Sequence, residues 1–404
     1  MALERRELAI AAWGSVAFAA VLASYTALRP VRDALVVDGD PDRIPWLFSA
    51  TFVAVAAVAP VWGAALARHA PRRLVPIAFQ VFAACELGFV ALVRADVAPV
   101  AVGRVFYVWA AVLGLFVVSV LWSLFADLLG PAAASRLYGP ITAGGTVGAI
   151  AGPALTQLLV GTIGVAGVLA MSAVLLELAT LAVGQVRRAA GEHAREAMPA
   201  RGGAFSGLAH VARSPYLAAI VGYVLCTACA ATFVYLEQVH LLRVALPDRI
   251  ARTQFLSSVD VWTNVCVLAV QALAAAPLLR RFGPGAVLCV LPVAQLAGIS
   301  WLAAAPSLGA LAVIAVVTRS ATHGLTRPAR ELLFTVLARD DKYAAKNVID
   351  TTAYRAGDFG ASWLVLAGAS GAVMVVAAIP LVVAWLSLAI ALGMGFRRRL
   401  KEAP

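Results

Sequence analysis

The sequence predicts an all-α membrane protein that crosses the bilayer twelve times. Of its 404 residues, 62% are hydrophobic and 13% are charged, whereas an ordinary soluble domain has about 25% charged residues. Apolar stretches of about 20 residues, the length of a transmembrane helix, follow one another along almost the whole chain. They lie at 8–28, 45–66, 74–93, 99–128, 138–160, 163–186, 216–242, 254–278, 284–304, 308–326, 347–370 and 372–396. No loop between them has the roughly 50 residues of a separate domain.

The first span and the distribution of basic residues predict the topology. Arg5 and Arg6 precede the first span as in a signal peptide, but the apolar run exceeds the roughly 7–15 residues of a signal core, so we expect an uncleaved helix. With the N-terminus in the cytoplasm, 22 of the 32 Lys and Arg residues fall on the cytoplasmic side. The positive-inside rule therefore predicts cytoplasmic termini. The net charge of +11 reflects this topology, and we expect no nucleic-acid partner.

An internal repeat predicts two halves of six spans each. The motif Pro-Asp-Arg-Ile precedes the second span at 41–44 and the eighth span at 247–250, and an arginine pair follows each span at 72–73 and 280–281. Two parallel six-helix halves form the layout of major-facilitator transporters. We expect an N-terminal bundle at 1–186, a cytoplasmic loop at 187–215, and a C-terminal bundle with a basic tail at 216–404.

Small residues in the fifth and seventh spans predict close helix packing. Gly144, Gly148 and Gly152 recur at every fourth position, which places them on one face and lets a neighbouring helix approach. This face serves either tight packing alone or a flexing interface used in rocking. Cys226 and Cys229 form a C-x-x-C without a second pair, and we interpret them as packing residues.

The chain lacks the motifs of catalysis. It contains no G-x-x-x-x-G-K-[ST] phosphate loop, and no Ser-His-Asp set or paired metal ligands stand out. The sequence therefore predicts a protein that is not an enzyme and needs no cofactor or metal. Transport by such a chain would be secondary: exchange, ion-coupled or facilitated.

Charged residues near the end of the first span are candidates for a substrate site. Arg29, Arg32 and Asp33 are spaced i, i+3, i+4 and share one helix face. An arginine at the bilayer centre costs about 2.5–3.5 kcal/mol, so it should face protein or water. The arginines would bind substrate and Asp33 would take part in coupling. Alternatively, the cluster snorkels at the interface, with Arg32 paired to a neighbouring carboxylate. Glu237 occupies the corresponding place in the seventh span.

The tenth and eleventh spans carry a second charged group. Arg319, His323 and Arg327 follow at i, i+4, i+8, which predicts a basic stripe, and Arg355 lies beside an acidic face on the eleventh span. These four would bind substrate, or they would belong to an ion-pair network that only holds the bundle together. The candidate coupling and gating acids are Glu331, Asp350 and Asp358. Glu86 and Glu177 stand alone in the third and sixth spans, as proton sites or as neutral packed acids.

Several segments resemble the non-mitochondrial ATP/ADP translocases of plastids and intracellular bacteria. The resemblance is carried by Tyr-Thr-Ala-Leu-Arg-Pro-Val-Arg-Asp-Ala-Leu-Val-Val at 25–37, by 117–127 with Arg-Leu-Tyr at 136–138, and by parts of 331–357. It implies that a transport lysine of that family falls on Arg32 and a glutamate on Glu237. A second family glutamate falls on Ala111, and a family lysine falls on Asp358. Because these two positions depart from the pattern, we expect weak or no ATP/ADP exchange.

The predicted protein is a monomeric carrier of a bacterial inner membrane. It would move an anionic or zwitterionic metabolite, with nucleotides among the candidates, by alternating access between its halves. Two alternatives stay open: a proton-coupled exporter of hydrophobic cations, and a membrane sensor or anchor that transports nothing, since a shared scaffold does not prove function.

Overall fold

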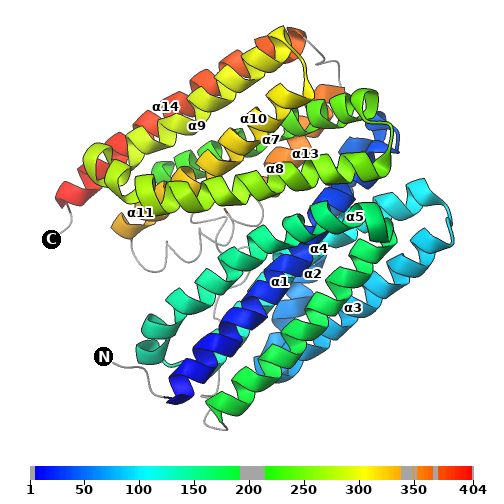
Figure 1. Ribbon diagram of the computed structural model, residues 1–404. Helices are drawn as coiled ribbons and strands as arrows, with labels where there is room; N and C mark the ends of the chain where they lie inside the picture. The colour runs from blue at the N-terminus through cyan, green and yellow to red at the C-terminus, as the bar shows by residue number, and fades with distance from the viewer. Residues whose placement is uncertain (1–4, 192–213, 338–348, 350–352, 367–371, 403–404) are drawn as a thin grey trace. The chain divides into compact units, whose positions relative to one another are not determined.

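The protein is all-helical, as predicted. The computed structural model describes residues 5–191, 214–337, 349, 353–366 and 372–402 (Figure 1). The described chain contains no β-strand, and nine of its helices are long and apolar enough to cross a membrane. All but one of the twelve apolar stretches lie wholly on helix, and 347–370 is described only in part.

Two of the long helices are broken by glycine. Gly164 has φ 67° and ψ 179°, and Gly283 has φ 76° and ψ 170°. Residues other than glycine rarely adopt this left-handed region because their Cβ atom clashes with the backbone. The break at Gly164 lies at the start of the sixth predicted span (163–186), and the break at Gly283 lies between the eighth (254–278) and the ninth (284–304).

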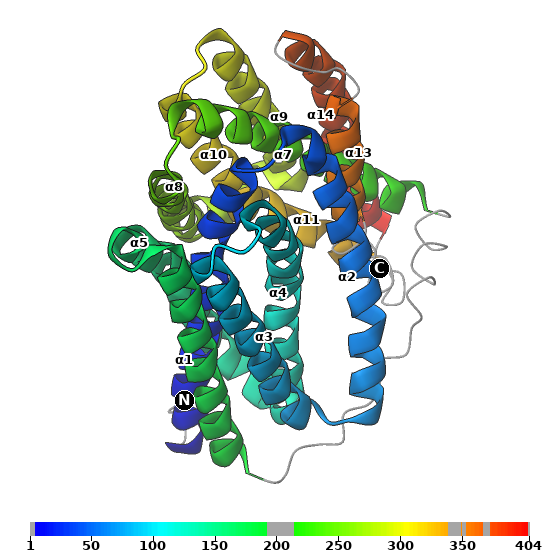
Figure 2. The same ribbon diagram turned by 90° about the vertical axis from the view of Figure 1, so that its right-hand side faces the viewer.

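The described residues fall into two compact units. The first takes residues from Met1–Gly39, Val53–Ala200 and Leu246–Val261, and the second from Asp40–Phe52, Arg201–Ala245 and Trp262–Pro404. The first unit is built on α1 (Arg5–Val37), α3 (Pro71–Arg94), α4 (Pro99–Leu128) and α5 (Pro131–Ala190). Within it, α3 and α4 run side by side (Figure 2).

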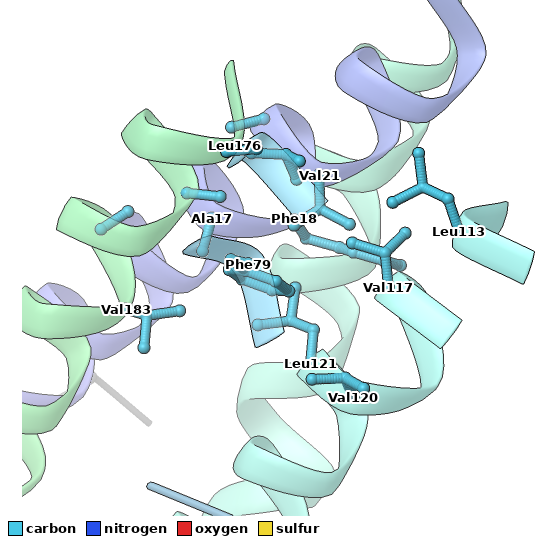
Figure 3. Packing of buried hydrophobic residues seen from close by; sticks show 14 of the residues in the cluster. Ala17, Phe18, Val21, Phe79, Leu113, Val117, Val120, Leu121, Leu176 and Val183 are labelled. Atoms are coloured by element: carbon cyan, nitrogen blue, oxygen red, sulfur yellow. The ribbon is translucent and has the colours of Figure 1, made fainter. Parts of the chain in front are cut away.

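The core of the first unit is apolar and closely packed. Helix α1 contributes Ala17, Phe18 and Val21, which meet side chains of the neighbouring helices (Figure 3). The partners shown there are Phe79 of α3, Leu113, Val117, Val120 and Leu121 of α4, and Leu176 and Val183 of α5. Lipid is as apolar as these side chains, so van der Waals packing holds such helices together.

The second unit contains the remaining helices. They are α7 (Pro215–Ala245), α9 (Ala276–Ala304), α10 (Leu308–Ala321), α11 (Arg327–Leu333), α13 (Tyr354–Leu366) and α14 (Ala372–Glu402), and α9 lies against α14 (Figure 1). Two π-helical turns, Gln271–Ala275 and Thr322–Thr326, continue α8 (Arg249–Val270) and α10. Gln271 Nε2 donates to the backbone carbonyl of His323 at 3.1 Å, so the two π turns are in contact.

Two helices contribute residues to both units. The first residues of α2 (Ile44–Arg68) belong to the second unit, where Trp46 packs edge-on against Trp363 with ring centroids 5.1 Å apart. The first residues of α8 (Arg249–Val270) belong to the first unit. The expected division at 187–215 stays a prediction, because residues 192–213 lie outside the described chain.

Candidate functional site

Of the two arginines in the predicted first-span site, Arg29 has the weaker polar contacts. Its side chain is 27% exposed, and its Nε lies 3.9 Å from Asp260 Oδ2 on α8. That separation is within ion-pair range but beyond a hydrogen bond. Arg29 makes no hydrogen bond with any described residue. The Asp260 side chain is only 6% exposed, so this pair carries opposite charges in a largely buried place.

Arg32 lies on the same helix and has closer partners. Its Nε donates to Oδ1 of the adjacent Asp33 at 2.8 Å, and its Nη2 lies 2.7 Å from the same oxygen. Its guanidinium also lies over the ring of Tyr107 on α4, 4.9 Å from the ring centroid. A cation over an aromatic face is attracted by the ring quadrupole. Arg32 is therefore held in place by one carboxylate and one ring.

A third charged cluster, which the sequence analysis did not single out, lies around Asp38. Arg249 Nε donates to Asp38 Oδ2 at 2.8 Å, and Arg252 Nη1 donates to Asp38 Oδ1 at 2.6 Å. Arg252 also donates to the backbone carbonyl of Pro247 at 3.0 Å. One carboxylate thus joins the end of α1 to the start of α8, and both arginines belong to or follow the second Pro-Asp-Arg-Ile motif.

The charged residues of the second unit have mixed partners. Arg319 Nη2 lies 3.5 Å from Oε1 of Gln238, which is buried on α7. Arg355 Nη1 lies 3.5 Å from Asp358 Oδ2, one turn along α13. Asp358 also accepts a hydrogen bond of 3.1 Å from Thr232 of α7. Glu237 is half-buried on α7 and pairs with no described residue.

The expected basic stripe is interrupted by the π turn at Thr322–Thr326. Positions i, i+4 and i+8 share a face only in an unbroken α-helix, and a π turn takes up an additional residue. Arg319 is half-buried, whereas His323 and Arg327 are exposed. Glu331 is half-buried on α11. Asp350 lies outside the described residues, so its role stays a prediction.

The three glycines of α5 lie directly against the backbone of α1. A Cβ atom at Gly144 would meet Ser15, one at Gly148 would meet Ala19, and one at Gly152 would meet Ala23 and the Thr26 hydroxyl. The close approach predicted for this face is therefore present. Its use in rocking stays a prediction.

Residues 8–357 of the chain match the profile of the Major Facilitator Superfamily. The chain belongs to this superfamily. It is therefore a multi-pass membrane protein and a secondary transporter, and the superfamily assignment indicates transport rather than catalysis. No curated protein is matched by sequence.

Solved transporters of the Major Facilitator Superfamily share the fold. A bacterial homologue of the iron transporter ferroportin, in an inward-facing state, is 13% identical with a TM-score of 0.64, and 99% of each chain is covered. The nucleoside transporter NupG is 14% identical with a TM-score of 0.59, covering 98% of this chain and 100% of that one. A D-xylose–proton symporter is 10% identical with a TM-score of 0.59, covering 96% of each chain. At these identities, the similarity extends to the fold alone.

Proposed function

We propose that this transporter moves a small anionic or zwitterionic metabolite across a bacterial inner membrane by alternating access. The observation that carries the proposal is that Arg29 is partly exposed and, among the described residues, has only one distant ion-pair partner. This arginine lies in a membrane-spanning helix, keeps 27% of its side chain exposed, and is paired only loosely with Asp260. A guanidinium has five N–H donors, and leaving them unused inside a membrane protein is costly. An anionic group of a substrate would use them.

Arg32 and the nearby acids define the charge pattern that a substrate would meet. Arg32 lies one turn beyond Arg29 on α1 and is oriented by Asp33 and Tyr107. A carboxylate or phosphate bound at Arg29 would lie close to this second cation, and Asp33 and Asp260 place negative charge beside the two arginines. Acids and bases therefore occur together, as a zwitterion or an anion carried with a proton requires.

The relation to nucleotide translocases belongs to the same proposal. The helix around Arg32 supports it, because the residues of 25–37 that carry the resemblance also carry the charged site. Asp358 argues against a nucleotide substrate. It pairs with Arg355 at 3.5 Å and stands where the resemblance places a lysine of that family, so the cation that the family has at this position is lost. We therefore propose a smaller anion than ATP as the substrate.

The test is uptake by the purified transporter in lipid vesicles. A panel of labelled organic anions, amino acids, nucleosides, nucleotides and hydrophobic cations is offered with and without a proton gradient. We expect uptake of an anion or zwitterion, and we expect Arg29→Ala to reduce it by tenfold or more, because one charge-assisted contact contributes about 1.5–3 kcal/mol.

Arg136→Ala is the matched control. Arg136 also belongs to the first unit, but its partner is Glu7 and its side chain is 38% exposed, so its loss should leave uptake unchanged. Uptake restricted to hydrophobic cations would contradict the proposal in favour of an exporter. Wild-type uptake by Arg29→Ala would remove Arg29 from the site.

A further inference from the structure

Glu86 is a fully buried acid without a cation. It lies on α3 with 0% exposure. Oε1 is 3.0 Å from the hydroxyl of Ser172 on α5, and Oε2 has no hydrogen-bond partner. A buried carboxylate without a counter-charge is strongly disfavoured, and such a group takes up a proton instead.

The hydroxyl of Ser172 can donate to Glu86 or to the backbone carbonyl of Ser24, but not to both. The Ser172 hydroxyl lies 3.0 Å from Glu86 Oε1, 2.8 Å from the Ser24 hydroxyl and 3.3 Å from the Ser24 carbonyl. A hydroxyl has a single proton to donate. If Glu86 itself carries a proton on Oε1, the acid donates to Ser172, and Ser172 donates onward to Ser24 on α1. Oε2 is then a neutral carbonyl oxygen, for which a missing partner costs much less than for a charged one.

The second half of the chain contains the neutral counterpart of this arrangement. On α3, residues Phe79, Ala83, Glu86, Phe89 and Val90 are buried, and on α9 the buried residues Leu288, Pro292, Gln295, Gly298 and Ile299 follow with the same spacing. In this register Glu86 corresponds to Gln295.

Gln295 makes the bond that a protonated Glu86 would make. Its Nε2 donates at 2.9 Å to the backbone carbonyl of Ala230 on α7. Ala230 corresponds to Ser24 at the 206-residue offset of the Pro-Asp-Arg-Ile motifs. In the second unit an uncharged donor therefore reaches this carbonyl directly, and in the first unit Ser172 stands between the donor and the carbonyl.

Other titratable groups lie on the helices around Glu86. On α5, Glu177 accepts a 2.7 Å hydrogen bond from Gln80 of α3, and on α3 Cys85 is exposed. Further titratable groups on these helices include Tyr25, which packs against Gly114, with Arg29, Arg32 and Asp33 on α1, and Arg104, Tyr107 and Asp127 on α4. None of them forms an ion pair with Glu86 among the described residues.

We propose that Glu86 is a proton-binding site, whose neutral carboxyl group joins α3 to α5 and α1 through Ser172 and Ser24. The proton is held within the first unit and serves as a hydrogen-bond donor. The proposal is independent of the substrate that the transporter carries.

Infrared spectroscopy of the full-length protein in lipid tests this directly, since a protonated carboxyl absorbs apart from a carboxylate. At neutral pH, the spectrum of Glu86→Gln should lack one protonated-carboxyl band that the wild-type spectrum contains. Glu86→Gln should also keep the wild-type melting temperature, since it repeats the residue of the second half. Ser172→Ala should shift the same band by removing its hydrogen-bond partner.

Glu7→Gln is the control, because Glu7 precedes the first span and is ion-paired with Arg136, so this variant should lose only carboxylate absorption. Loss of a carboxylate band in Glu86→Gln, with no change in the protonated region, would overturn the proposal. A Glu86→Gln protein that does not fold would also contradict it, because a neutral amide should replace a neutral acid.

Discussion

Replacing Gly148 by alanine tests the contact between α5 and α1. The added Cβ would overlap the carbonyl oxygen, carbonyl carbon and Cα of Ala19. All three are backbone atoms, so no side chain can rotate away, and the helices must separate. Gly184→Ala, on the same helix, adds a Cβ with no other heavy atom within 4 Å.

The two substitutions should change the free energy of unfolding in opposite directions. Inside a helix, alanine is favoured over glycine by about 0.5–1 kcal/mol, and both variants gain this. Inserting a methyl group into a packed site costs about 1–3 kcal/mol, and only Gly148→Ala meets that cost. We therefore expect Gly184→Ala to be about 0.5–1 kcal/mol more stable than the wild type. Gly148→Ala, once its own helix gain is subtracted from the cost, should lie up to about 2.5 kcal/mol below the wild type.

Thermal unfolding of the purified protein measures this difference. The nine tryptophans provide a fluorescence signal, and one heating rate is kept throughout, because unfolding of such proteins is commonly irreversible. Melting temperatures should rank Gly184→Ala first and Gly148→Ala last. Equal melting temperatures for the two variants would refute the close approach of α1 and α5.

Three further predictions concern charge and topology. Arg32→Ala should abolish uptake with folding intact, while Arg32→Lys should retain part of it, because the charge survives without the bidentate fork; equal uptake by wild type and alanine variant would favour the snorkelling interpretation. Asp38→Asn should lower the melting temperature, since each charged hydrogen bond lost to Arg249 and Arg252 contributes about 1.5–3 kcal/mol, and an unchanged value would mean that water replaces these bonds. Reporter fusions in the 187–215 loop should give a cytoplasmic signal; a periplasmic one would reverse the topology.

Hydropathy and glycine patterns were sufficient to predict the fold from the sequence. The helix break at Gly164 falls at the start of the sixth predicted span, and the glycines of α5 pack against α1. These features depend on local chemistry: the length of an apolar run, and the absence of a Cβ atom. Such properties can be predicted from the sequence without knowing which residues distant in the chain come into contact.

Side-chain partners were much harder to predict. Asp260 lies inside the eighth predicted span, and an acid in a span is itself a sign of a site, so it could have been proposed as the partner of Arg29. Asp38 gave no such signal, because it lies in a loop and its arginines follow more than 200 residues later. The predicted stripe of Arg319, His323 and Arg327 assumed an unbroken α-helix, which sequence periodicity cannot distinguish from one with a π turn.

The π turn at Gln271–Ala275 explains how the two halves can differ in length without an interrupted helix. The repeated motifs begin at 41 and 247, whereas the arginine pairs that follow begin at 72 and 280, so the second half carries two residues more in this stretch. A π turn accommodates one residue beyond the α-helical count. The π turn thus accommodates one of the two additional residues within the helix. Residues beyond the turn are rotated about the helix axis by roughly 100°, the angular step of one α-helical residue, so a duplicated sequence presents a different set of side chains there than its counterpart in the first half.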